Sequence, residues 1–441
     1  MKSICVFAPI ALALSLACHG QSVAAHVPVA DGDLVTVSVD EAVAQAITAN
    51  PEIRAAVRRL SLAELKTKTS RSLDDPMLQV RDWDTPLQKP LDLNEAQAMF
   101  MVQQTFLSKE KRDLRAKVDA DDAEVAASNL ESLRQEVSAE VRKAAADLMR
   151  NADEIKLQDQ QASVLKETVS AALAEYTTGK VPQSGVLRAQ IALTRLNEQI
   201  IELEQERDTA RAQLNTLRGH SPDEAVEIAG TYGGPAALPS IEDLESLAID
   251  NRPELTGLRK QVLKSSSQSQ LTRMAMKPDF TVGLGYMVMP TGSAYRNAYM
   301  AEMAMNLPWL NRDRHDGEAK QADAATDVDK AELEARTTQV FLEIRQAQVN
   351  ILAAQKRIKL YRDTLLPQAE AAFKASAAAY QNNRGEFSNL IESQNMLLDI
   401  QTALYKALAE ADASVAELER AIGAPLLTKP IANSSTERNS K

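Results

Sequence analysis

The chain has 441 residues, enough for two or three ordinary domains, but its composition is unusual for a globular protein of this length. Only 4% of the residues are aromatic and glycine occurs 15 times, which excludes a conventional all-β fold, whereas the residues that favour helices are abundant. The net charge of −11 excludes nucleic acid as a partner, because binding phosphates requires a basic surface. No spacing typical of a catalytic, nucleotide-binding or metal-binding motif occurs, so we expect no enzymatic activity, no cofactor and no metal site.

The N-terminus has the pattern of an export signal. A lysine at position 2 precedes an apolar stretch over residues 4–16, which is too short to span a membrane as a stable helix. Small residues at 23–25 permit cleavage before His26, which would make residues 1–25 the signal segment. Alternatively, the sequence Ser-Leu-Ala-Cys at 15–18 resembles a lipobox, so that residues 1–17 would be removed and Cys18 would carry lipid. Either outcome predicts an exported chain.

The first half then contains a long helical hairpin. Residues 109–178 include neither glycine nor proline, and a continuous helix of that length would extend roughly 100 Å, which is typical of a coiled-coil rod. After Gly185 a row of residues recurs at alternating steps of three and four, as in the seam of a coiled coil. We therefore predict a hairpin over residues 109–218. The row consists of Leu193, Leu196, Ile200, Leu203, Arg207, Ala210, Leu214 and Leu217.

The second half repeats this organisation. Residues 318–366 lack glycine and proline, Pro367 interrupts the pattern, and a second heptad row runs from Phe387 to Ile422, which predicts a hairpin over residues 316–422. Shared landmarks show an internal repeat: Pro51 and Pro253 are 202 positions apart, as are Pro76 and Pro278. We expect one repeat over residues 26–230, a second over 231–424, and a flexible tail over 425–441.

Each repeat also carries a predicted pair of strands near residues 77–106 and 279–307. The clearest strand is residues 280–288, where apolar side chains alternate with small or polar ones, while Arg81 and Asp82 disturb the alternation in residues 77–83. Four strands cannot close a transmembrane barrel, which needs roughly eight or more, but three chains of four would supply twelve. The alternative is a soluble pair of hairpins at the end of a periplasmic coiled coil.

The duplicated order of these motifs resembles the outer-membrane efflux protein (TolC) family. The matching residues are a start at 37–42 (VSVDEA) and the string at 50–53 (NPEI), each with a second copy. The resemblance implies a mainly α protein with a small β part. It would be a homotrimer whose long antiparallel coiled-coil helices form an α-barrel and whose strands form a shared twelve-stranded outer-membrane β-barrel, with an equatorial region near residues 220–240 and the C-terminus.

The same resemblance implies a function and partners. The chain would be the passive exit duct of a tripartite efflux pump, lying in outer-membrane lipid, extending into the periplasm, and working with a periplasmic adaptor and an inner-membrane pump of the resistance-nodulation-division type. Residues 74–78 (DDPML) and 104–112 are similar to the branch that serves heavy-metal pumps, although prolines and a glycine typical of that branch are absent. The cargo is therefore open between heavy-metal cations and other small molecules. The alternative function is a lipid-anchored periplasmic coiled-coil scaffold.

Two regions are candidate functional sites. The turns between the paired helices would form the periplasmic tips that meet the adaptor, with Gly179 and Asn383 suited to a left-handed conformation. Family members carry a pair of acidic residues beyond the second tip that narrows the closed tunnel; here Glu392 matches the second acid and Asn389 replaces the first. The alternative for Glu392 is a solvated helix face. Eight methionines in or beside the strands could bind soft metal ions or pack as plain apolar residues. The tip candidates are Gly179, Lys180, Asn383, Arg384 and Gly385.

Overall fold

The computed structural model describes residues 34–83, 97–179, 182–235, 238–382, 384–426 and 428–430. The export signal with Cys18 and the tip residues Lys180 and Asn383 lie outside these ranges. The described chain is mainly helical with small sheets, which confirms the predicted fold class. Within it, no helix is both long enough and apolar enough to cross a membrane.

The first half begins with two short helices whose starts are set by capping residues. The Ser38 side chain accepts a hydrogen bond from the Glu41 N–H at the start of α1, and the Asn50 side chain accepts from two N–H groups at the start of α2, where Pro51 occupies the first position. The elements of this half are β1 (Val35–Ser38), α1 (Val39–Ala49), α2 (Pro51–Thr69), β2 (Met77–Trp83), β3 (Gln97–Phe106), α3 (Lys109–Thr177), α4 (Gln183–Leu217) and β4 (Val226–Ala229).

The second half has a closely similar order. Ser240 caps α5 as Ser38 caps α1, and Pro253 starts α6 as Pro51 starts α2. Pro367 does not break the long helix here, because a π-helical turn lies just before it and the chain continues in α8. The elements are β5 (Gly233–Pro235), α5 (Ile241–Asn251), α6 (Pro253–Arg273), β6 (Phe280–Val288), β7 (Asn297–Met305), α7 (Arg312–Leu360), α8 (Leu366–Gln381), α9 (Phe387–Ile422) and β8 (Thr428–Pro430), with 3₁₀ turns at Met274–Met276 and Pro308–Asn311 and the π turn at Tyr361–Leu365.

In both halves a hydrogen bond joins the residue at the start of a short helix to the end of a hairpin helix. Asn50 donates a hydrogen bond to the carbonyl of Leu217 at the end of α4, and Arg252 donates one to the carbonyl of Ala421 at the end of α9. A glycine with positive φ follows each hairpin helix: Gly423 (+72°) comes directly after α9, and Gly219 (+74°) comes after α4 and its last cap residue, Arg218. The two junctions are therefore built by residues at matching places in the two halves.

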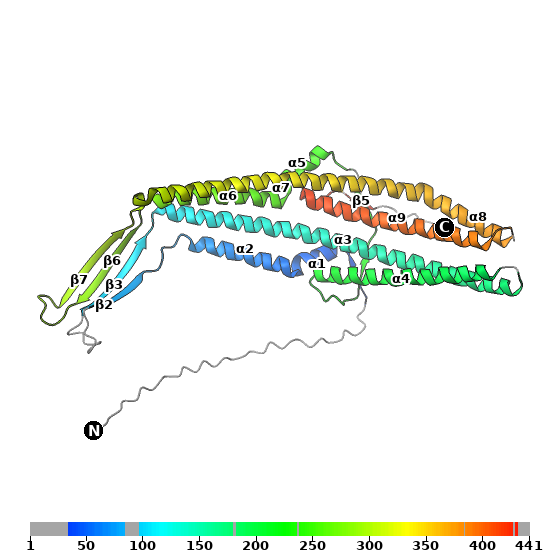
Figure 1. Cartoon of the computed structure of the whole chain (residues 1–441), viewed down its shortest axis with the longest axis horizontal. Helices are drawn as coiled ribbons and strands as arrows, with labels where there is room; N and C mark the ends of the chain where they lie inside the picture. Colours follow the sequence, from blue (N-terminus) through cyan, green and yellow to red (C-terminus); the bar gives the residue numbers. More distant parts are fainter. Residues whose placement is uncertain are drawn as a thin grey trace, which may run out of the picture. The chain divides into compact units, whose positions relative to one another are not determined.

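The helices lie side by side in the same order as the strands. Helix α3 packs against α2 and α6, and α6 packs against α7, while the strands that continue them form a sheet in the order β2-β3-β6-β7 (Figure 1). The α3–α4 and α8–α9 hairpins extend away from this sheet (Figure 1). Strands β2 and β7 form its two edges, and neither edge pairs with another strand among the described residues.

The sheet has two unlike faces because successive side chains point to opposite sides. One face presents exposed apolar residues, among them Phe100, Val102 and Leu284. On the other face the side chains of Met99 and Met101 are buried, and Met101 covers the space above Gly283 and Gly285. The packing of Met101 over two glycines supports the interpretation of this methionine as an apolar filler.

Both predicted coiled-coil seams are confirmed by burial. In α4 the residues Leu196, Leu203, Ala210 and Leu214 are buried, while the remaining members of the row are half-buried. In α9 every third or fourth residue from Phe387 to Ile422 is buried or half-buried. The coils thus bury one stripe of each helix, as heptad spacing requires.

Two short sheets were not predicted. Strand β1 pairs in parallel with β4, which joins the segment before α1 to the segment after α4. Strand β5 pairs with β8, which joins the link between the halves to the C-terminal segment. Strand β8 falls inside residues 425–441, so the prediction of a flexible tail is wrong for its first part. Helix α4 also begins at Gln183, two residues before Gly185, which lies within its first turn.

Candidate functional site

The tip of the first hairpin is a tight turn around a left-handed glycine. Helix α3 ends at Thr177, and Gly179 has a φ of +72° and donates its N–H to the carbonyl of Tyr176. The space beside Gly179 is open, so only its backbone conformation demands glycine there. The predicted left-handed conformation of Gly179 is confirmed.

The tip of the second hairpin closes by backbone hydrogen bonds onto the end of α8. The N–H groups of Arg384 and Gly385 both donate to the carbonyl of Ala379, at 2.9 and 3.1 Å. A side chain on Gly385 would meet the Ala379 Cβ at 3.0 Å and the Tyr380 N at 3.1 Å, so this glycine permits the close approach of the turn to the helix. Arg384 itself is exposed.

The two tips are joined by a side-chain contact that the sequence did not reveal. The Tyr380 hydroxyl donates a hydrogen bond to the Glu175 carboxylate, and the Tyr380 ring packs edge-on against Phe387 with ring centroids 5.4 Å apart. Burial, together with the hydrogen bond to Glu175, raises the pKa of the Tyr380 hydroxyl. The repeat aligns Tyr176 with Tyr380, but sequence spacing alone could not show that only one of them bridges the hairpins.

The two gate candidates are on the exposed side of α9 within one chain. Glu392 borders a groove of about 680 Å³ between α3, α4 and α9, and Arg188 and Arg195 of α4 line the same groove. Asn389 is exposed and is not among the residues that line it. The structure therefore brings Glu392 near the arginines of α4 and does not bring it together with Asn389 in this groove.

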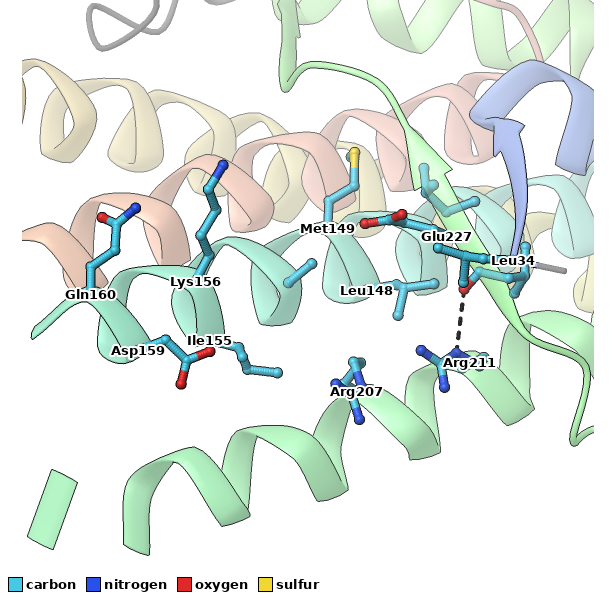
Figure 2. A pocket seen from close by; sticks show the side chains of 13 residues that line it. Leu34, Leu148, Met149, Ile155, Lys156, Asp159, Gln160, Arg207, Arg211 and Glu227 are labelled. Carbon is cyan, nitrogen blue, oxygen red and sulfur yellow. Dashed lines mark hydrogen bonds between the residues drawn. The ribbon is translucent and has the colours of Figure 1, made fainter. Parts of the chain in front are cut away.

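A second groove lies between α3, α4 and β4 (Figure 2). Its volume is about 400 Å³, and its lining combines apolar side chains such as Leu148 with the cations Lys156, Arg207 and Arg211. The Arg211 guanidinium donates to the Val226 carbonyl at 3.3 Å, and Asp208 forms ion pairs with both Arg207 and Arg211. These two arginines of α4 therefore already have partners within the chain.

A buried acidic group lies where the link between the halves crosses α3 and α9. The Tyr232 hydroxyl donates to Asp153 of α3 at 2.9 Å, and the N–H of the next residue, Gly233, donates to Asp412 of α9. Burial raises the pKa of both carboxyls, that of Asp412 to about 7. The described residues contain no cluster of His, Cys, Asp or Glu able to hold a metal ion.

Comparisons with known proteins agree with this architecture. Residues 244–424 match the model of the family described as outer membrane efflux protein. This part of the chain, which is less than half of it, is similar to the outer membrane efflux protein family. It includes α7, α8 and α9, and therefore the second hairpin with Glu392 and the second tip.

Similar proteins cover nearly the whole chain. The cobalt-zinc-cadmium resistance protein CzcC of Cupriavidus metallidurans is 22% identical over 388 residues, which are 88% of this chain and 90% of CzcC. The outer membrane protein VceC of Vibrio cholerae has a TM-score of 0.72 at 18% identity, with 88% of this chain and 96% of VceC covered. The outer-membrane channel OprN has a TM-score of 0.73 at 17% identity, with 87% and 89% covered. The likeness to the solved structures thus shows a shared fold.

Proposed function

We propose that the chain is the outer-membrane exit duct of a tripartite efflux pump, which conducts substrates passively to the cell exterior. The observation that carries this proposal is the four-stranded sheet β2-β3-β6-β7, whose edge strands β2 and β7 have no further partner strand in the described part of the chain. Unpaired edges cannot face lipid, because their backbone groups would lack hydrogen bonds. Three copies that pair edge to edge would close one shared barrel of twelve strands. The exposed apolar residues on one face of the sheet suit a lipid-facing wall.

The helical part supports a tunnel below this barrel. Helices α2, α3, α6 and α7 of each copy lie side by side in strand order, so the same closure would join α7 of one copy to α2 of the next. Exposed apolar residues on α2 and α7, including Leu62, Leu65 and Val328, fit such a contact. In this proposal residues 26–230 and 231–424 are the two repeats of each protomer.

The duct works in this proposal with a periplasmic adaptor and an inner-membrane pump of the resistance-nodulation-division type. The two tips, with Gly179, Lys180 and Asn383 to Gly385, would meet the adaptor, and the Tyr380–Glu175 hydrogen bond would hold them together at rest. Export follows from the signal in residues 1–25, with acylation of Cys18 as the alternative fate of the N-terminus. Mass spectrometry of the mature N-terminus distinguishes His26 from acylated Cys18.

The cargo class in this proposal is heavy-metal cations, supported by the likeness to the resistance protein CzcC over most of both chains. Deletion of the chain should then lower tolerance to cobalt, zinc or cadmium in the organism that encodes it. An unchanged tolerance to all three metals, with lowered tolerance to another class of compound, would instead assign the duct to that class.

The main test is the state of the exported protein. We expect it to fractionate with outer membranes, to form an SDS-resistant or cross-linkable trimer, and to conduct ions in planar lipid bilayers. A monodisperse monomer that is soluble without detergent would contradict the duct and would favour the periplasmic scaffold.

Glu392 and Asn389 are proposed as residues of the closed tunnel's narrow entrance. Three Glu392 side chains close to one axis would attract cations, since like charges held together favour a counter-ion. Glu392→Ala should therefore weaken the block of single-channel current by added divalent cations, while trimer assembly is retained. Glu386→Ala, at the start of the same helix, is the control; equal effects of the two substitutions would show that Glu392 has no special position.

A further inference from the structure

The two faces of the sheet β2-β3-β6-β7 carry different kinds of apolar side chain. The face that exposes Phe100, Val102 and Leu284 is built mainly from phenylalanine, valine, leucine and tyrosine. On the opposite face the described strand residues include no valine, leucine, isoleucine or phenylalanine, and methionine recurs instead. A face that needed only apolar filling would use the same residues as the other face, so this restriction indicates a role for the sulfur atom. The methionines of this face within the strands are Met77, Met99, Met101, Met287 and Met300.

The pairing of β3 with β6 brings two of these methionines together, and a third follows at the end of β6. Met99 lies directly opposite Met287, and side chains at such positions have Cβ atoms about 4.5–5.5 Å apart. The N–H of Met289 donates to the Arg296 carbonyl at 2.8 Å, so the pairing of β6 with β7 continues past Val288. Met289 is two residues from Met287 and therefore lies on the same face. We call Met99, Met287 and Met289 the thioether cluster.

One polar side chain holds two sulfur atoms of the thioether cluster near each other. The Gln97 amide donates hydrogen bonds to the sulfur of Met287 at 3.5 Å and to the sulfur of Met289 at 3.3 Å. Met99, on the same face of β3 as Gln97, is 2% exposed. A thioether is a weak hydrogen-bond acceptor on a flexible side chain, so an ion that binds sulfur more strongly can replace the amide after small rotations.

The surroundings of the thioether cluster favour one kind of ion. Among the described residues of the four strands there is no histidine, and the acid on this face, Glu302, lies opposite Gly283, four residues from Met287 along β6. Carboxylate and imidazole ligands, which divalent ions such as Zn²⁺ favour, are therefore not at hand. Arg81 lies opposite Met99 and repels a divalent cation more strongly than a monovalent one. Because thioethers are soft ligands, the surroundings favour a soft monovalent cation.

We propose that the thioether cluster binds a soft monovalent cation, Cu(I) or Ag(I), through the sulfur atoms of Met99, Met287 and Met289. Gln97 holds the sulfur atoms together when no ion is bound. Each chain carries a complete cluster, and in the proposed duct three clusters would line the inside of the barrel, so the access of the ion rests on that function. The site adds a soft metal to the divalent cargo proposed above.

Motif spacing in the sequence predicts no such site, because it detects ligands that are close along the chain. Met99 and Met287 are in opposite halves of the chain, and only the register of β3 with β6 brings them together. Met101 has a separate role, since it fills the space above two glycines of β6. The proposal therefore depends on strand pairing and not on the number of methionines in the sequence.

The first experiment measures the binding of Ag(I), a soft ion that, unlike Cu(I), is stable in air. The trimer purified in detergent is titrated with silver nitrate in a chloride-free buffer and followed by calorimetry. We expect one tight site per chain, and X-ray absorption should find sulfur atoms as the neighbours of the bound silver. Zn(II) should give no comparable site, because the cluster lacks the ligands that this ion favours.

Replacing the three methionines tests whether the thioether cluster is that site. Met99→Leu/Met287→Leu/Met289→Leu keeps apolar side chains of similar size and removes the sulfur atoms, so Ag(I) binding should weaken at least about tenfold. Met303→Leu/Met305→Leu makes the same change on the other face of the sheet and should bind silver as the native chain does. Equal binding by the two variants overturns the proposal, as does a shell of nitrogen or oxygen around the silver.

The second experiment uses the native chain and so does not depend on the folding of a variant. An oxaziridine reagent modifies thioether sulfur, and mass spectrometry of peptides measures the rate at each methionine. Bound Ag(I) should slow the modification of Met287 and Met289 and leave Met396, which is exposed on α9, unaffected. Unchanged rates at Met287 and Met289 overturn the proposal. A chain that forms no trimer contradicts the duct instead, whereas a trimer that binds no silver contradicts only the cluster.

Discussion

The ionisation of Asp412 is linked to the fold. Its carboxyl is buried on α9 beneath Gly233, and burial raises its pKa from 3.8 to about 7, opposed by the Gly233 N–H and by Arg142. Because the folded pKa lies above the unfolded one, the folded state binds the proton more tightly. The contribution of Asp412 to stability is therefore greatest below pH 4, falls as the pH rises from about 4 to about 7, and stays at the lower level above that. The upper limit of this loss is about 4 kcal/mol.

Asp412→Asn should remove this pH dependence, because an amide oxygen still accepts the Gly233 N–H but carries no charge. We expect the melting temperature of the variant to exceed that of the native protein at pH 8 and the difference to shrink at pH 5. Thermal unfolding in detergent between pH 5 and pH 8 measures this difference in melting temperature. Asp399→Asn, an exposed aspartate on the same helix, is the control. A difference that grows toward low pH would contradict the assigned burial.

At the tips, the Tyr380 hydroxyl links the two hairpins by donating a side-chain hydrogen bond to Glu175. Tyr380→Phe removes this bond and keeps the ring contact with Phe387, so the resting tips should separate more readily. A hydrogen bond to a charged group stabilises by about 1.5–3 kcal/mol, which predicts a rise of roughly tenfold or more in open probability in planar bilayers. Tyr176→Phe, a substitution at the residue next to Glu175, should have no such effect. Equal behaviour of the two variants would show that the bond does not restrain opening.

At the scale of elements, the glycines that end α4 and α9 decide how the hairpins join the short helices. A Cβ on Gly423 would lie 2.7 Å from the Asn251 carbonyl oxygen, and one on Gly219 would lie 2.5 Å from the Ala49 carbonyl oxygen. Both contacts are with backbone, which cannot move aside as the end of a side chain can. In each half, one glycine therefore determines both the end of the hairpin helix and its junction with the short helix.

Gly423→Ala should lower the free energy of unfolding by about 2 kcal/mol or more, from the positive φ together with the clash. Gly317→Ala is the matched control, because that glycine lies in α7 with open space around it, where alanine favours the helix. Chemical denaturation in detergent compares them. If Gly423→Ala is as stable as Gly317→Ala, the close approach of Gly423 to Asn251 is not maintained in solution.

The elements that the sequence predicts are those with a long or regular pattern. The rods and the strand Phe280–Val288 follow from periodicity, and even β2 formed where Arg81 and Asp82 broke the alternation, because β3 pairs with it along its whole length. The sheets β1–β4 and β5–β8 have strands of three or four residues whose partners are nearly 200 residues away, so no local pattern marks them. Strand β8 carries no local strand pattern, because its only ordered contact as a strand is its pairing with β5.

At the scale of the whole molecule, the sequence predicts the tips and Glu392 as candidate sites but not the residues around them. Heptad spacing places Glu392 off the buried stripe of α9, yet it cannot say which side chains of α4 border it, because that depends on how two separate hairpins pack. The contact of Tyr380 with Glu175 is likewise between the halves. What the sequence leaves open is therefore the relation of one half to the other, and of one copy to the next.

The relation between copies can be tested at the sheet edges. If β2 of one copy pairs with β7 of the next, cysteines placed on both edges, as in Val80→Cys/Ala301→Cys, should join neighbouring chains under oxidation. Products on denaturing gels should then extend to a trimer and stop there, since a ring of three leaves no free edge. Each single variant should give no trimer and serves as the control. Within one chain β2 and β7 are separated by β3 and β6, so an intrachain bridge is not expected. A ladder that continues beyond three copies would mean that the edges do not close, and the duct would lose its lipid-facing wall.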